Sequence, residues 1–153
     1  MEVEFIIPKS IFNVGEFQRL NAARATALAL SIKRDYESTV KSWNRKPVFV
    51  VEHSKDSITV GTDDINYKGV EDGVPAHGID VISNVMRFPV GYKAKTSPGV
   101  IGSRGGGKFG KIVVAKHVNH PGIQARKFTD AIKQKHDAIF FRDADDTISI
   151  ANK

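Results

Sequence analysis

Residues 102–108, GSRGGGK, match the first seven positions of the phosphate-binding pattern G-x-x-x-x-G-K-[ST]. The eighth position holds Phe109, where the pattern requires a hydroxyl side chain for the magnesium ion. The pattern also requires a buried strand before the loop and a helix N-terminus after it. Here Pro98 precedes the loop and a strand-like segment follows Gly110. The sequence therefore argues against nucleotide hydrolysis and favours a flexible glycine-rich connector.

Histidines and acidic pairs are the other candidates for chemistry. His117 and His120 lie three residues apart near the end of an expected strand, so their side chains point to opposite faces and do not chelate one ion. The chain has no cysteine, which excludes disulfide bonds, thiolate ligands and cysteine nucleophiles. The acidic pairs at 63–64, 71–72 and 145–146 stand in turn-like contexts, where aspartate caps helices or forms turns. We therefore expect no enzyme and no catalytic, metal or cofactor site.

Positive charge is concentrated in one part of the chain. Residues 87–135 contain eleven Lys or Arg side chains and a single acid, Asp130, whereas the remaining residues have twelve basic and sixteen acidic side chains. Such a segment suits a polyanion or an acidic protein partner, but the charge by itself favours a solvated basic face.

A nucleic-acid-binding module is one interpretation of this charge. Phe88, Tyr92, Phe109 and Phe128 are interspersed among the basic residues, as in a stacking surface, although Phe88 and Phe128 are better explained as core residues. No helix-turn-helix, RNA-recognition, KH or zinc-finger pattern is visible. A small basic nucleic-acid-binding module is therefore kept as the alternative function.

The elements that would position these residues begin with a long helix. A chain of 153 residues with 41% hydrophobic side chains predicts a single domain, 1–153. Between Val14 and Trp43 apolar residues recur at helical spacing, with Asn13 as a candidate N-cap and Pro47 preventing continuation. Five alanines at 21–30 allow close approach of a neighbouring surface, for which we expect the face of a sheet.

Strand-like segments follow this helix. Residues 48–53 and 57–62 are rich in β-branched side chains and predict a hairpin. Further strands are expected at 79–81, 85–90 and 111–118.

The C-terminal part is expected to contain a second helix at 121–136. Residues 139–141 and 147–150, around the acidic turn 143–146, indicate a last hairpin. The order of elements predicts an α+β fold, in which the long N-terminal helix and the second helix pack on a mainly antiparallel β-sheet.

A long glycine-rich insert interrupts this pattern at residues 94–110. It contains six glycines, so ordering it costs much backbone entropy for little contact energy. We expect it to be a flexible loop in the free protein, or an assembly contact that becomes ordered on binding.

Neither a membrane span nor a secretory signal is expected. No apolar run approaches the roughly 20 residues that cross a bilayer. The amino terminus, MEVEFIIPKS, is acidic where a secretory signal is basic.

Four segments in order resemble a family of small tail-completion, or head-tail connector (neck), proteins of long-tailed double-stranded DNA bacteriophages. They are INYKGVEDGVPAHGI at 65–79, NVMRFPV at 84–90, KIVVAKHVNHPGIQARKF at 111–128 and TDAI at 129–132. In that family an aromatic residue and an acid-glycine element close one strand, an Arg-Phe strand comes later, and a His-Pro-Gly turn leads into an apolar helix. The matching positions here are Tyr67, Glu71, Gly73, His77, Arg87, Phe88, His120, Pro121, Gly122 and Phe128.

The resemblance implies a structural virion protein without catalysis and without a cofactor. It would complete the tail or join head and tail as a ring subunit in the neck. The implied partners are further copies of the chain in a homo-oligomeric ring, expected to be a hexamer, the head-tail connector proteins, and the tail tube or tail terminator proteins. The protein would be made in the host cytoplasm, would contact no membrane, and would make only transient, non-specific contact with genomic DNA passing through the ring.

In such a ring the basic side chains near the insert are interface or lumen candidates. They either line the channel or meet acidic faces of neighbouring subunits, and the sequence does not choose between these roles. The candidates are Lys93, Lys95, Arg104, Lys108 and Lys111.

Overall fold

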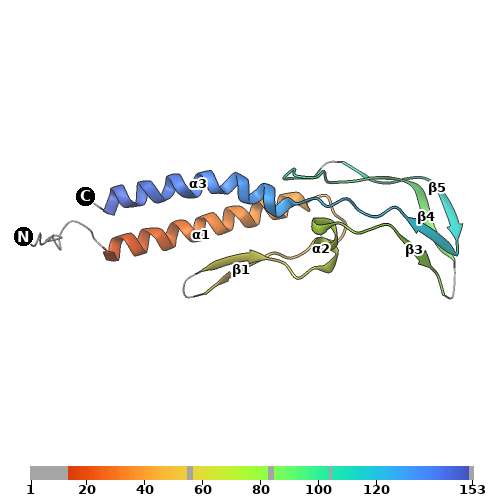
Figure 1. Ribbon diagram of the computed structural model, residues 1–153, viewed down its shortest axis with the longest axis horizontal. Helices are drawn as coiled ribbons and strands as arrows, with labels where there is room; N and C mark the ends of the chain where they lie inside the picture. The colour runs from red at the N-terminus through yellow and green to blue at the C-terminus, as the bar shows by residue number, and fades with distance from the viewer. Residues whose placement is uncertain (1–13, 55–56, 83–84, 104, 152–153) are drawn as a thin grey trace, which may run out of the picture.

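The computed structural model describes residues 14–54, 57–82, 85–103 and 105–151, and it shows an elongated molecule (Figure 1). Two long helices, α1 (Val14–Thr39) and α3 (Phe128–Ala151), run side by side and form one end. The other end, which we call the arm, consists of β3 (His77–Asp80), β4 (Met86–Lys93), β5 (Gly107–Ala115) and β6 (His117–His120).

The remaining elements lie against α1 and between the two ends. They are β1 (Val50–His53), β2 (Ile58–Gly61) and the short helix α2 (Ile65–Asp72). The antiparallel pair β1–β2 contacts α1, which confirms the hairpin predicted for 48–62. α1 ends at Thr39 and not near Trp43, and the candidate cap Asn13 lies outside the described residues.

The strands confirm the predicted α+β class and its antiparallel character. All three pairings, β1–β2, β3–β6 and β4–β5, are antiparallel. Among the described residues these pairs form three separate two-stranded sheets, so the helices do not cover one continuous sheet. Isolated two-stranded pairs are marginally stable in water, so each depends on what packs against it.

α2 was not expected from the sequence, which placed Tyr67 and the Glu71-Gly73 element at the close of a strand. Its N-cap is Asp64, whose side chain accepts hydrogen bonds from the backbone N–H groups of Asn66 and Tyr67. Gly73 follows its last turn with a φ of 84°, a conformation that favours glycine. An aspartate cap followed by a glycine beyond the last turn is the signal that could have predicted this helix.

The structure also corrects the C-terminal predictions. α3 begins at Phe128 and not at Pro121, because Ile123 pairs with Val74 and Lys127 has a left-handed φ of 51°. The expected hairpin at 139–150 is wrong, since the helix continues to Ala151. Residues 128–151 contain no Gly or Pro that would end a helix, and contact with α1 overrides the weak strand preference of the β-branched residues.

The hydrophobic core lies where α1, α2 and α3 meet. Its centre is the ring of Tyr67, whose centroid lies 5.2 Å from that of Phe49 and 6.0 Å from that of Phe128. Such aromatic pairs stabilise a fold by about 0.5–1.5 kcal/mol beyond the effect of burial. The buried cluster consists of Tyr36, Val40, Phe49, Tyr67, Phe128 and Ile132.

Two tyrosines of this core differ in one respect that can be tested. The Tyr36 hydroxyl forms a 3.1 Å hydrogen bond with the hydroxyl of Thr129, whereas the buried Tyr67 hydroxyl has no partner among the described residues. Burial raises the pKa of Tyr67, so this group remains protonated. We expect Tyr36→Phe to lower the free energy of unfolding by about 1 kcal/mol and Tyr67→Phe to leave it unchanged or raise it, as measured by chemical denaturation. An equal loss in both variants would contradict this account.

Candidate functional site

Half of the residues that carry the resemblance meet where α2 faces the start of α3, whereas His77, Arg87, Phe88 and His120 lie on strands of the arm. Glu71 is central, because its two carboxylate oxygens accept hydrogen bonds from the backbone N–H groups of Phe128 (2.8 Å) and Thr129 (2.9 Å). The first N–H groups of a helix lack partners within the helix, so Glu71 caps α3 from a distant part of the chain. We call this region the junction; its members are Tyr67, Glu71, Gly73, Gly122 and Phe128.

The two glycines of the junction permit close contact between two backbone segments. Gly73 and Gly122 have φ values of 84° and 85°. Between them, Val74 and Ile123 exchange backbone hydrogen bonds of 2.9 and 2.7 Å. A Cβ on Gly122 would lie 2.5 Å from the carbonyl oxygen of Val74, and a Cβ on Gly73 would lie 2.8 Å from backbone atoms. The backbone of the acid-glycine element thus crosses the backbone of the His-Pro-Gly element in close contact. Pro121 directly precedes Gly122 in the second of these elements.

The histidines next to this crossing are engaged with the backbone. The rings of His77 and His120 stack with centroids 5.0 Å apart. His77 Nδ1 lies 2.9 Å from the carbonyl oxygen of Pro75, while His120 Nδ1 accepts a bond from the N–H of Gly122. The neutral His120 ring therefore keeps its proton on Nε2, which opposes shared metal binding by the pair.

His117 lies at the other end of the same pair of strands, opposite Asp80. Its Nδ1 is 2.6 Å from Asp80, and its Nε2 is 2.9 Å from the side-chain oxygen of Asn119. These hydrogen bonds raise the pKa of His117. Within the described ranges, no group of three or more His, Asp or Glu side chains is arranged to hold a metal ion.

The arm exposes unusually many apolar side chains. Arg87 is exposed and Phe88 half-buried on β4, opposite Val114 and Val113 of β5, so neither belongs to the core cluster. The interpretation of Phe88 as a core residue is therefore wrong, whereas Phe128 is fully buried as expected. The exposed large apolar residues of this end are Ile82, Val85, Val90, Ile112, Val113 and Val114.

The interface or lumen candidates do not form one cluster. Lys93, Lys108 and Lys111 are exposed on β4 and β5. Lys95 instead donates through Nζ to the carbonyl oxygen of Ser42 at 2.7 Å, just beyond α1. Arg104 lies outside the described residues.

The glycine-rich insert contacts the helical end of the molecule at several points. The Gly99 N–H donates to the carbonyl oxygen of Arg126 at 2.7 Å, and the Ser42 N–H donates to the Ser103 hydroxyl at 3.2 Å. Thr96 is buried and Ile101 packs against the core cluster. Residues 107–110 belong to β5, so a strand and not a helix N-terminus follows the GSRGGGK segment. The segment therefore connects β4 to β5 and packs against the helical end, whereas the sequence predicts a flexible loop for residues 94–110.

A buried polar contact joins α1 and α3. Asp35 accepts hydrogen bonds from Lys135 Nζ and from His136 Nε2, both at 2.7 Å. Partial burial alone would raise the pKa of Asp35, but these two bonds outweigh it and lower the pKa. His136 is only 4% exposed, so a substrate cannot reach this Asp-His pair and we assign it a structural role. No spacing in the sequence indicated the contact.

Comparisons with protein-family models, with curated proteins and with solved structures found no match to this chain. No helix within the described ranges combines the length and the apolar character that a membrane span requires.

The crossing at the junction predicts strong intolerance at Gly122. In Gly122→Ala we expect the free energy of unfolding to fall by about 2–4 kcal/mol, since left-handed strain costs about 1–2 kcal/mol and overpacking about 1–3 kcal/mol. Gly61→Ala is the matched control, because a Cβ on Gly61 meets nothing within 4 Å. Thermal and chemical denaturation measure the free energy of unfolding of the two variants. A mild effect at Gly122 would mean that the crossing is not tight.

The contact between α1 and α3 predicts a dependence on pH. Because its pKa is lowered in the folded state, Asp35 stabilises the fold above its ordinary pKa of 3.8 and loses this effect as the pH falls through the lowered value. Asp35→Asn should therefore reduce the free energy of unfolding by about 1–3 kcal/mol at neutral pH, with the difference shrinking below roughly pH 4.

The control for this prediction is Asp137→Asn, which removes an exposed pair with Lys133. Its effect should remain below about 1 kcal/mol at every pH. Urea denaturation across the pH range checks both variants, and a difference for Asp35→Asn that does not vary with pH would contradict the assignment.

Proposed function

We propose that the chain is a structural virion protein that completes the tail or joins head and tail as a ring subunit in the neck of a long-tailed bacteriophage. The sequence resemblance motivates the proposal. Its support in the structure is a shape suited to assembly, since the arm presents apolar side chains on strands that have partners on one side only.

Charge favours contact between unlike surfaces. The described residues of the arm, at 77–82, 85–93 and 107–120, include five Lys or Arg side chains and one acid. Residues 50–54 and 57–72, around β1, β2 and α2, include five acids and one Lys. Two arms would repel each other, whereas an arm and the acidic surface of a neighbour would attract. Such heterologous contacts close into a ring when the rotation between neighbouring subunits divides a full turn, and we propose six subunits.

The alternative function, a small basic nucleic-acid-binding module, is favoured by the same positive charge on the arm. It predicts binding to any DNA duplex, with an affinity that falls steeply as salt rises, because phosphate contacts release counterions. A filter-binding titration without association at low salt removes this alternative.

The proposed ring contact is tested by Ile112→Asp, on β5 of the arm. Ile112 is 71% exposed, so the substitution should leave the fold intact while placing a charge in the apolar contact. Leu30→Asp is the control, because Leu30 is 45% exposed and lies in α1, outside both the arm and the acidic surface. We expect Ile112→Asp to reduce incorporation into assembled tails at least tenfold, measured by quantitative mass spectrometry of purified particles, and Leu30→Asp to have a smaller effect.

Two results would count against the proposal. Equal incorporation of both variants would show that the arm is not the ring contact. Absence of the unaltered protein from purified virions would overturn the function itself. Mass per particle should be measured on assembled tails, because a free subunit can be monomeric and assemble only on its partner.

A further inference from the structure

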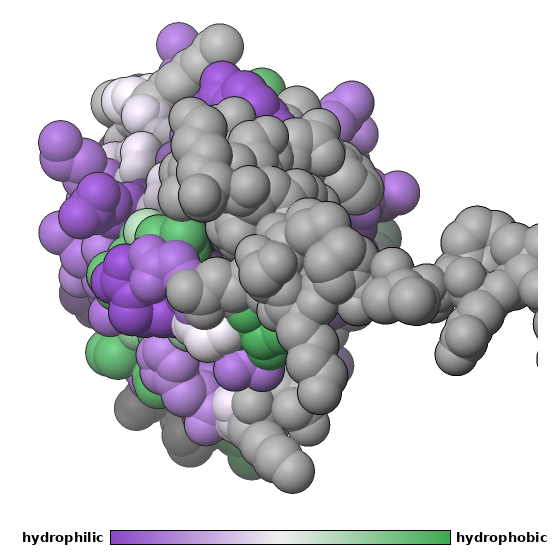
Figure 2. Space-filling view, turned by 90° about the vertical axis from the view of Figure 1, so that its left-hand side faces the viewer, coloured by the Kyte–Doolittle hydropathy of each residue, from purple (hydrophilic) through white to green (hydrophobic). Residues whose placement is uncertain are grey.

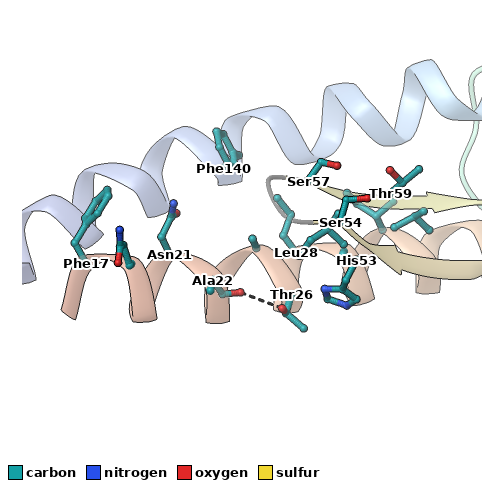
Figure 3. A pocket seen from close by; sticks show the side chains of 16 residues that line it. Phe17, Asn21, Ala22, Thr26, Leu28, His53, Ser54, Ser57, Thr59 and Phe140 are labelled. Carbon is teal, nitrogen blue, oxygen red and sulfur yellow. Dashed lines mark hydrogen bonds between the residues drawn. The ribbon is translucent and has the colours of Figure 1, made fainter. Parts of the chain in front are cut away.

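A groove of about 850 Å³ runs along α1, beside the β1–β2 hairpin and α3 (Figure 3). Its wall on α1 includes Phe17, Ala25 and Leu28, and its opposite walls include Ile58 and Phe140. Among the described residues that line it, none is Asp, Glu, Lys or Arg. The Thr26 hydroxyl on this wall is already bonded to the carbonyl oxygen of Ala22 at 3.0 Å. The described lining therefore combines apolar side chains with polar ones such as Gln18 and Ser57.

We propose that the N-terminal segment of the same chain, residues 5–12, binds in this groove. The segment reads FIIPKSIF and contains five large apolar side chains and a single charge, at Lys9. Its first part, residues 5–8, contains no Asp, Glu, Lys or Arg, and neither does the described lining of the groove. Burying apolar side chains there stabilises the contact by about 25 cal/mol for each Å² removed from water.

The position of the segment makes this contact geometrically accessible. α1 begins at Val14, and Phe17, near that end of the helix, already lines the groove. The groove extends along α1 to Ile32, a helical distance of roughly 22 Å at 1.5 Å per residue. Eight extended residues span roughly 26 Å, which is enough to follow the groove back along α1. Figure 2 views the molecule from this end and shows hydrophobic residues next to hydrophilic ones.

The tether favours the segment of the same chain over that of a second copy. A short flexible link raises the effective concentration of a segment near its site to the millimolar range. A second copy must reach that concentration in solution before it competes. The contact requires no virion and is therefore independent of the proposed function.

Paired cysteines test this inference cleanly, because the 153 residues of the chain include no cysteine. The test variant combines Ile6→Cys with Ala25→Cys, on the groove wall. The matched control combines Ile6→Cys with Ala23→Cys, an exposed position of α1 that does not line the groove. Under mild oxidation of dilute protein we expect the test pair to form its disulfide at least tenfold faster than the control pair.

Isotopic labelling identifies the chain that supplies the segment. In a mixture of ¹⁵N-labelled and unlabelled test variant, the cross-linked peptides should be uniformly labelled or uniformly unlabelled. Peptides of mixed labelling would assign the groove to a second copy and overturn the proposal. Equal rates for the test and control pairs would also overturn it.

A second measurement does not depend on disulfide formation. The single variant Ala25→Cys should react with a maleimide several-fold faster when Ile6→Asp is present in the same chain. Ala23→Cys should react at one rate in both backgrounds, and circular dichroism should show equal helix content. No change at Ala25→Cys would overturn the proposal.

Discussion

The packing of aromatic rings around Tyr67 is the interaction on which the rest of the structure depends. The ring touches elements from the whole length of the chain, including Phe49, Trp43 and Phe128. Glu71, one turn further along α2, caps the start of α3. One short helix thus fixes both the side-by-side arrangement of the long helices and the point from which the arm extends.

The small core has a consequence for the remainder of the molecule. The buried cluster is confined to the junction and its surroundings, so the arm and the groove along α1 keep apolar side chains in contact with water. Surfaces of this kind usually mark contacts with other chains or with other segments. The two regions differ in charge, because the arm is basic, whereas the described residues that line the groove include no Asp, Glu, Lys or Arg. The arm therefore suits an acidic partner surface, and the groove suits an apolar segment.

Local sequence signals were sufficient where local contacts decide the structure. The 3.6-residue spacing predicts α1, and the β-branched runs predict the first hairpin. The sequence predicts neither the extent of α3 nor the presence of α2. The acidic residues at 143–146 resemble a turn, and only contact with α1 makes the helical alternative better. The resemblance identifies Glu71 and Gly122 as matching positions. Only the tertiary structure shows that Glu71 caps α3 and that Gly122 lies at the backbone crossing.

The sequence by itself determined the α+β class, the long first helix, the glycine-rich insert and the concentration of positive charge between residues 87 and 135. These properties depend on residue types and on spacings of a few positions. The tertiary structure alone decided that α2 caps α3, that Lys95 binds the end of α1 while Lys93, Lys108 and Lys111 are exposed, and that Asp35 meets His136. The physical reason is that these contacts join residues tens of positions apart, and the free energy of such contacts does not appear in any local pattern.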